Sequence, residues 1–136
     1  MISASDLGAW EFCPRQVYLK HILGVKPEKK EVMVKGTVKH KIFERMIDSH
    51  KKNRRFEVSM IIEDTLSKYV EDFEKFGTDL DSFKKDLNQC FDILGEKINK
   101  HRFPIPEFCE EWIESESLGL KARVDVIFDD SGEWVV

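Results

Sequence analysis

The stretch GLKARVDVIF, residues 119–128, decides the fold because its side chains alternate between polar and apolar with the period of a β-strand. We expect a strand from Lys121 to Phe128 with one buried face and one polar face. The face expected to be buried carries Leu120, Ala122, Val124, Val126 and Phe128. Lys121, Arg123 and Asp125 share the polar face. The stretch therefore predicts a half-buried strand that presents an aspartate beside basic residues.

Two further strands flank this one, and the three together form an antiparallel meander. Glu111–Leu118 precedes the middle strand and Glu133–Val136 follows it. Turn-forming residues at Leu118-Gly119 and at 129–132 connect the strands. From Pro104 onward the chain is therefore predicted to form the beginning of a sheet.

The chain before these strands is predicted to be helical. Ser3 or Ser5 caps a short helix that ends near Phe12. Further helices are expected over residues 14–23, 32–52, 58–76 and 80–101. Apolar residues at helical spacing mark the two longest, at Val34, Val38, Ile42 and Met46 and at Leu87, Phe91, Leu94 and Ile98. The visible fold class is α+β, with a helical region over residues 1–103 and strands over residues 104–136.

The composition is that of a globular protein. The 136 residues are 41% hydrophobic and 35% charged, which fits one domain. No apolar run approaches the roughly 18 residues that span a bilayer, and the start MISASDLGAW lacks the basic-then-apolar order of a secretion signal. These features predict a cytoplasmic protein without a membrane partner. Cys13, Cys90 and Cys109 form neither a disulfide framework nor a Cys-x-x-Cys zinc motif.

Charge is unevenly distributed along the chain. Residues 1–55 hold 13 Lys and Arg against 6 Asp and Glu, whereas residues 56–136 hold 9 against 20. A nucleic acid would therefore meet the amino-terminal part, where KKNRR at residues 51–55 is the densest basic run. The alternative is a solvated helix end, because basic residues also complement the negative end of a helix dipole.

A second candidate for chemistry lies in the predicted helix over residues 32–52. His40 and Glu44 are one turn apart and share a side of the helix, and Gly36 removes a side chain one turn before His40. A lone histidine beside an apolar stripe is more often a core or boundary residue than a ligand, and His40 taken alone is explained in this way. Asp125 taken alone is explained as a partner in cross-strand charge pairing.

The order of these short motifs resembles a known family. Ser3-x-x-x-Leu7 and Cys13-Pro-Arg precede a Gly36-x-x-x-His40 helix, and Gly119-Leu-x-Ala-Arg-x-Asp125 follows on a strand. This arrangement is similar to the CRISPR-associated RecB-like exonucleases of the PD-(D/E)XK nuclease superfamily. The likeness extends over nearly the whole chain, although Ala122 stands where that family usually has Gly.

The resemblance implies an α/β fold with a restriction-endonuclease-like core and a metal-dependent DNA exonuclease acting on single-stranded ends during CRISPR spacer acquisition. It implies that His40 and Asp125 are catalytic metal ligands, and that Cys13 is one of four cysteines of an iron-sulfur cluster. A carboxylate with an imidazole suits Mn²⁺ better than Mg²⁺. The implied partners are DNA and the CRISPR integrase.

The sequence also departs from that family. The Glu-x-Lys motif expected after Glu133–Val136 and the other cluster cysteines are missing, so we expect a single incomplete nuclease domain over residues 1–136 that is nearly inactive by itself. An exposed edge strand predicts self-association. The alternative function is a non-catalytic module that binds DNA or a protein. A third possibility is a helical interaction protein whose metal motif arose by chance.

Other candidate residues are weaker. Arg15, Lys20 and Arg123 are the candidate phosphate contacts. Glu114 and Glu116 could lend a carboxylate to Asp125, but the pattern favours an ordinary acidic edge that also includes Glu110 and Glu111. Trp10, Tyr18 and Trp112 could stack on unpaired bases, although aromatic residues at this spacing are usually core residues.

Overall fold

The computed structural model describes residues 1–136 and divides them into two compact units. The first unit joins Met1–Glu28 to Phe108–Val136, and the second unit comprises Lys29–Glu107. The chain forms six helices and a four-stranded sheet, which confirms the α+β class and the order of helices before strands. Because the first unit draws on both ends of the chain, the compact units do not follow sequence order.

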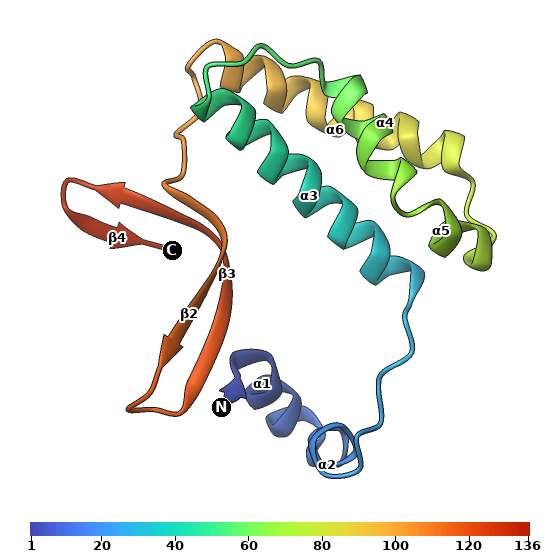
Figure 1. Cartoon of the computed structure of the whole chain (residues 1–136), viewed down its shortest axis with the longest axis vertical. Coiled ribbons are helices and arrows are strands. Elements are labelled where there is room, and N and C mark those ends of the chain that lie inside the picture. The colour runs from blue at the N-terminus through green and yellow to red at the C-terminus, as the bar shows by residue number, and fades with distance from the viewer. The chain divides into compact units, whose positions relative to one another are not determined.

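The second unit consists of four helices. These are α3 (Glu31–Lys51), α4 (Val58–Ser67), α5 (Val70–Phe76) and α6 (Leu80–Asn99). In Figure 1, α3 and α6 are the long helices of this unit, and α4 packs against both. Their apolar stripes face one another, as the spacing predicted.

The core of the second unit is built from these stripes. Fully or nearly fully buried residues include Val38, Ile42, Met46, Ile62, Phe73, Leu87, Phe91 and Ile98. Leu94 belongs to the predicted stripe but is only half-buried. Phe73 and Phe83 pack with ring centroids 5.4 Å apart. The periodic apolar residues thus pack against one another, and every buried apolar residue of the chain except Ile127 lies in this unit.

The helix predicted over residues 58–76 is broken, and that prediction was wrong. Helix α4 ends at Ser67 and α5 begins at Val70. The hydroxyls of Thr65 and Ser67 donate to the carbonyls of Ile61 and Asp64, both at 2.7 Å. Such bonds to the preceding turn compete with the helix ladder and favour bending. The break allows Phe73 to be completely buried.

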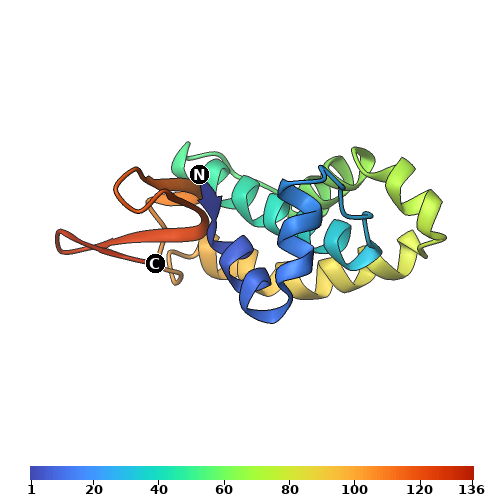
Figure 2. The ribbon, with the colours of Figure 1, turned by 90° about the horizontal axis from the view of Figure 1, so that it is seen from below.

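The first unit is a sheet with two short helices. Strand β1 (Ile2–Ser3) leads into α1 (Ala4–Phe12) and α2 (Pro14–His21). Strands β2 (Phe108–Ser115) and β3 (Leu120–Asp130) form the antiparallel core of the sheet, β4 (Glu133–Val135) pairs with the end of β3, and β1 pairs with β3 in parallel. Figure 2 shows β1 beside the strands of the other chain end.

The hairpins differ in how well their turns were predicted. Ser131 and Gly132 connect β3 to β4 in a two-residue loop with φ of 57° and 93°, which confirms the tight turn predicted at residues 129–132. The connection between β2 and β3 has four residues, Glu116 to Gly119, instead of a tight turn at Leu118-Gly119. The strand expected over 111–118 therefore begins and ends three residues earlier.

The apolar face of β3 is less buried than expected. Val124 and Val126 are half-buried, while Arg123 and Asp125 are exposed, so the alternation is present. The one buried apolar residue of the strand, however, is Ile127, on the face predicted to be polar. Helix α1 has 9 residues and β3 has 11, so α1 is about 13 Å long against about 36 Å for the strand. It is too short to cover the sheet.

A buried carboxylate anchors the start of the first unit. Ser3 caps α1 and forms a reciprocal capping box with Asp6. The side chain of Asp6 also meets the Lys20 ammonium at 2.5 Å and the His21 Nε2 at 3.1 Å. The Lys20 ammonium, aided by the Ser3 hydroxyl and by His21, holds the pKa of the Asp6 carboxyl well below its usual range, although burial opposes this. These contacts tie α1 to α2.

We expect the stability of the first unit to fall in acid because of Asp6. A native pKa below the unfolded value contributes stability that is complete above about pH 4 and is lost as the pH falls toward the native pKa. In Asp6→Asn the free energy of unfolding should be lower at neutral pH and should change less between about pH 5 and about pH 2. Tryptophan fluorescence during urea unfolding reports on this unit, which contains Trp10, Trp112 and Trp134. Asp92→Asn on α6 is the control; an equal flattening there would contradict the assignment.

Candidate metal centre

The ladder between β2 and β3 places two carboxylates opposite one another. Cys109 pairs with Val126 and Glu111 pairs with Val124, so Glu110 and Asp125 occupy the rung between these pairs. Side chains on one rung of an antiparallel ladder are close neighbours. A carboxylate oxygen of Glu110 lies within 4.8 Å of one of Asp125. The first unit thus brings together two acids that are 15 positions apart in the chain.

The backbone at Glu110 is unusual. Its φ of 56° is in the left-handed region, which residues other than glycine rarely adopt and which costs on the order of 1 kcal/mol or more. Regular pairing is interrupted on this rung, since the ladder resumes only at Glu111. Strained backbone of this kind concentrates at functional sites. Here it accompanies the carboxylate that faces Asp125.

Arg123 holds the Glu110 side chain. Its Nε lies 2.8 Å from the Glu110 Oε2, and the Glu110 side chain is 8% exposed against 45% for Arg123. One N–H of the guanidinium is used in this contact, and an arginine has five. Arg123, a candidate phosphate contact, is therefore fixed beside the two carboxylates and keeps donors for a further ligand.

His40 lies on α3, in the second unit. Its side chain is exposed. Glu44, one turn further, is paired with Lys41 at 2.6 Å, so the side of α3 that carries His40 is polar. A side chain at Gly36 would meet nothing within 4 Å, so no close approach of another segment explains that glycine.

The remaining candidates lie elsewhere. Cys13, the residue between α1 and α2, is half-buried, as is Cys109 on β2, while Cys90 is exposed on α6; none of the three forms a disulfide. Arg15 is exposed on α2. Lys20 is engaged with Asp6. None of these side chains belongs to the carboxylate pair.

Glu114 and Glu116, the two acids predicted to be able to lend a carboxylate to Asp125, have other surroundings. Glu114 pairs in register with Lys121, which fits cross-strand charge pairing. Glu116 lies in the loop between the strands. The carboxylate beside Asp125 is instead Glu110, which the sequence assigned to an acidic edge. The signal that could have found it is the loop length, because a four-residue loop sets the register that pairs these positions.

Comparison with known families identifies the helical part of the chain. A family model described as the DNA replication factor Dna2 matches residues 1–107. The chain belongs to the Dna2 family. This family is nuclease-related, so the coarser part of the expected function, DNA processing by a nuclease-type protein, agrees with the match.

The Dna2 match has a defined extent. It includes all six helices, and with them His40 and Cys13, and it ends at the residue before β2. Glu110 and Asp125 lie beyond the match, so the carboxylate pair is supported by its geometry. No curated protein and no solved structure matches the chain. None of its helices combines the length and the apolar character needed to cross a membrane.

Proposed function

We propose that this member of the Dna2 family binds a divalent cation through Asp125, Glu110 and His40 and uses it to hydrolyse DNA from single-stranded ends. The observation that carries the proposal is the pair of carboxylates on neighbouring strands, Glu110 and Asp125, within 4.8 Å of one another. Two carboxylates held this close offer a divalent cation several oxygen ligands at once. The family match supplies the reason to choose DNA as the substrate class.

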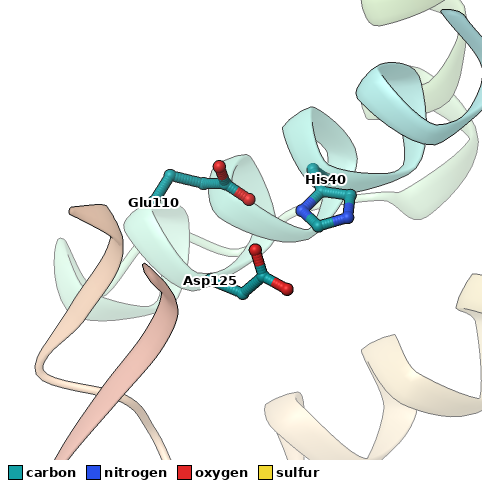
Figure 3. Close-up of side chains that lie close together, drawn as sticks. All are labelled: His40, Glu110 and Asp125. Carbon is teal, nitrogen blue, oxygen red and sulfur yellow. The ribbon is translucent and has the colours of Figure 1, made fainter. Parts of the chain in front are cut away.

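The donor atoms of this proposed site suit Mn²⁺ or Mg²⁺. Figure 3 draws its three side chains, one imidazole and two carboxylates. Carboxylate oxygens bind both ions, whereas the imidazole favours transition metals, so we expect Mn²⁺ to bind more tightly than Mg²⁺. Assignment of His40 rests on the motif order that also placed Asp125.

The chemistry follows from these groups. Hydrolysis of a phosphodiester builds negative charge on the phosphoryl oxygens, and a bound divalent cation stabilises that charge and lowers the pKa of its water. Asp125 and Glu110 would hold the cation. Arg123 fixes Glu110 through Nε and keeps N–H donors for the phosphate of the strand being cut. In this proposal Arg123 therefore has two roles: it positions Glu110 and it contacts the phosphate.

Direct measurement of Mn²⁺ binding tests the proposal. Titration of the whole protein with Mn²⁺, followed by the loss of the free-ion paramagnetic resonance signal, should give an affinity that falls more than about tenfold in His40→Ala and in Asp125→Asn. Asp130→Asn, further along β3, is the matched control and should bind as the unchanged protein does. Equal affinity in all four proteins would rule the proposed ligands out.

Cleavage is a separate readout. End-labelled single-stranded DNA should be shortened only with Mn²⁺ or Mg²⁺ present, and any such activity should disappear in Asp125→Asn.

The finer role in CRISPR spacer acquisition, with the integrase as partner, rests on the motifs that resemble the CRISPR-associated exonucleases and is tested by copurification with the integrase. Iron and sulfide analysis of the purified protein tests Cys13 as a cluster ligand.

The second candidate function is a DNA-binding module without cleavage. It is favoured by the basic run at residues 51–55, whose cations exceed what the adjacent acids neutralise. Retained affinity for single-stranded DNA in a protein that binds no Mn²⁺ would support this module over the nuclease.

A further inference from the structure

Two basic segments of the second unit come together at one end of its helices. Helices α3 and α6 both end there, and the rings of His50 and His101 meet with centroids 5.1 Å apart. The Lys51 ammonium donates to the backbone carbonyl of Glu107. Figure 1 shows the carboxyl ends of α3 and α6 next to each other. Segments 51–57 and 97–102, distant in sequence, thus form one surface, the basic end.

The basic end carries a large excess of positive charge. Segments 51–57 and 97–102 contain seven Lys and Arg and one acid, Glu57. Lys52 is paired with Asp48 at 2.9 Å and Lys100 with Glu96. Lys100 and Arg102 hold the pKa of the Glu96 carboxyl below its usual range. Arg54, Arg55 and Lys97 are exposed and form no ion pair.

Complementing the helix dipoles does not account for this excess. A helix end carries about half an elementary charge, and its effect fades beyond the last turn. The paired Lys52 and Lys100 already stand at the caps of α3 and α6. Arg54 and Arg55 lie beyond the end of α3 and are close to other cations. Clustered cations repel each other, and an anion bound among them removes that repulsion.

The basic end also contains an open pocket beside an aromatic ring. The pocket has a volume of about 650 Å³ and is lined by Arg55, Phe56, Glu57, Met60 and Asn99. Phe56 is half-buried, because one edge of its ring rests against α6 at Gly95, where an added Cβ would lie 3.7 Å from the ring. The ring is therefore held in place while part of it lines the pocket. A fixed aromatic ring beside arginines can stack on an unpaired base.

We propose that the basic end is a binding site for single-stranded nucleic acid, in which Arg54 and Arg55 contact phosphates and one base stacks on Phe56. The site does not include His40. His40 precedes Lys51, the last residue of α3, by 11 positions, which is about 16 Å along the helix axis. The proposal goes beyond metal chemistry and holds whether or not cleavage occurs.

Binding of a fluorescent single-stranded oligonucleotide, measured by anisotropy in EDTA at several salt concentrations, tests the site. Each phosphate contact contributes about 0.7 to the slope of log affinity against log salt. The double variant Arg54→Ala, Arg55→Ala should therefore lower the slope by about 1.4. The matched control, Lys68→Ala with Lys85→Ala, removes two exposed cations elsewhere in the same unit and should leave the slope unchanged.

Phe56 is tested by comparing normal DNA with an abasic strand of equal length. Phe56→Leu should weaken binding of normal DNA about five- to a hundredfold and leave binding of the abasic strand unchanged. Asn99→Trp fills the pocket from the end of α6 and should have the same effect without altering the core. An unchanged slope in the double arginine variant, or an equal loss in the lysine control, would overturn the site. Equal weakening of both strands by Phe56→Leu and Asn99→Trp would overturn the stacked base.

Discussion

Glu110→Gln is expected to lower the affinity for Mn²⁺ more than about tenfold, as much as Asp125→Asn does. The amide keeps the size of the side chain but removes the negative charge and one of the two acceptor oxygens, both of which a hard cation requires. It also weakens the contact with the Arg123 Nε, so the position of the remaining oxygen is less well fixed. The measurement is the same titration with Mn²⁺.

Glu111→Gln is the matched control for this prediction. Glu111 is the next residue of β2, is exposed and projects to the opposite face of the strand. An equal loss of affinity in Glu111→Gln would show that general negative charge, and not the carboxylate pair, attracts the ion. Arg123→Ala separates a direct ligand from a residue that acts on the ion through Glu110. It should weaken Mn²⁺ binding less than Glu110→Gln does.

Asp125 could be predicted from sequence and Glu110 could not. Alternation along residues 119–128 is a local signal, and it places Asp125 on the polar face of a strand. The residue opposite Asp125 depends on the register of the two strands. Shortening the loop by two residues shifts this register by two positions along β2. A tight turn at Leu118-Gly119 would pair Asp125 with Trp112, whereas the observed loop puts Glu110 opposite.

The helices of the second unit were predicted because their signals are also local. The four-residue recurrence of Val34, Val38, Ile42 and Met46 corresponds to the buried side of α3. The break before α5 accompanies hydroxyl bonds to the preceding turn and depends on the burial of Phe73, which is a tertiary effect. The parallel pairing of β1 with β3 joins Ile2 to Leu120. A strand of only two residues, paired with a segment near the other end of the chain, is too short to give a periodic pattern in the sequence.

Charge patterning gave a partial answer for nucleic-acid binding. The run at residues 51–55 is recognisable in the sequence. The cations of segment 97–102 join it only because α3 and α6 end at the same place in the structure. The pocket beside Phe56 needs the close crossing of α4 and α6 at Gly95, where an added Cβ would lie 2.5 Å from Val58 Cγ2. Both features exist only once the helices pack, which is why sequence alone left a solvated helix end as an equal alternative.

Ile98→Ala is expected to destabilise the second unit by about 2–5 kcal/mol. Ile98 belongs to the predicted stripe of α6 and is completely buried. Truncation removes its buried surface and leaves a cavity that the packed helices fill only in part. That loss is a large share of the roughly 5–15 kcal/mol that stabilises a typical domain. Urea unfolding followed by circular dichroism at the helix band measures it, since the four longest helices include α3, α4 and α6 of this unit.

Ile93→Ala provides the matched control on the same helix. Ile93 is 63% exposed on α6, whereas Ile98 is 0% exposed, so the same chemical change removes far less buried surface. The expected destabilisation is below about 1 kcal/mol. Similar losses in the two variants would mean that helix propensity, and not burial, controls the stability of α6, and the packing of α3 against α6 that forms the basic end would then need another explanation. A large loss in Ile98→Ala alone supports the packing from which both the core and the basic end arise.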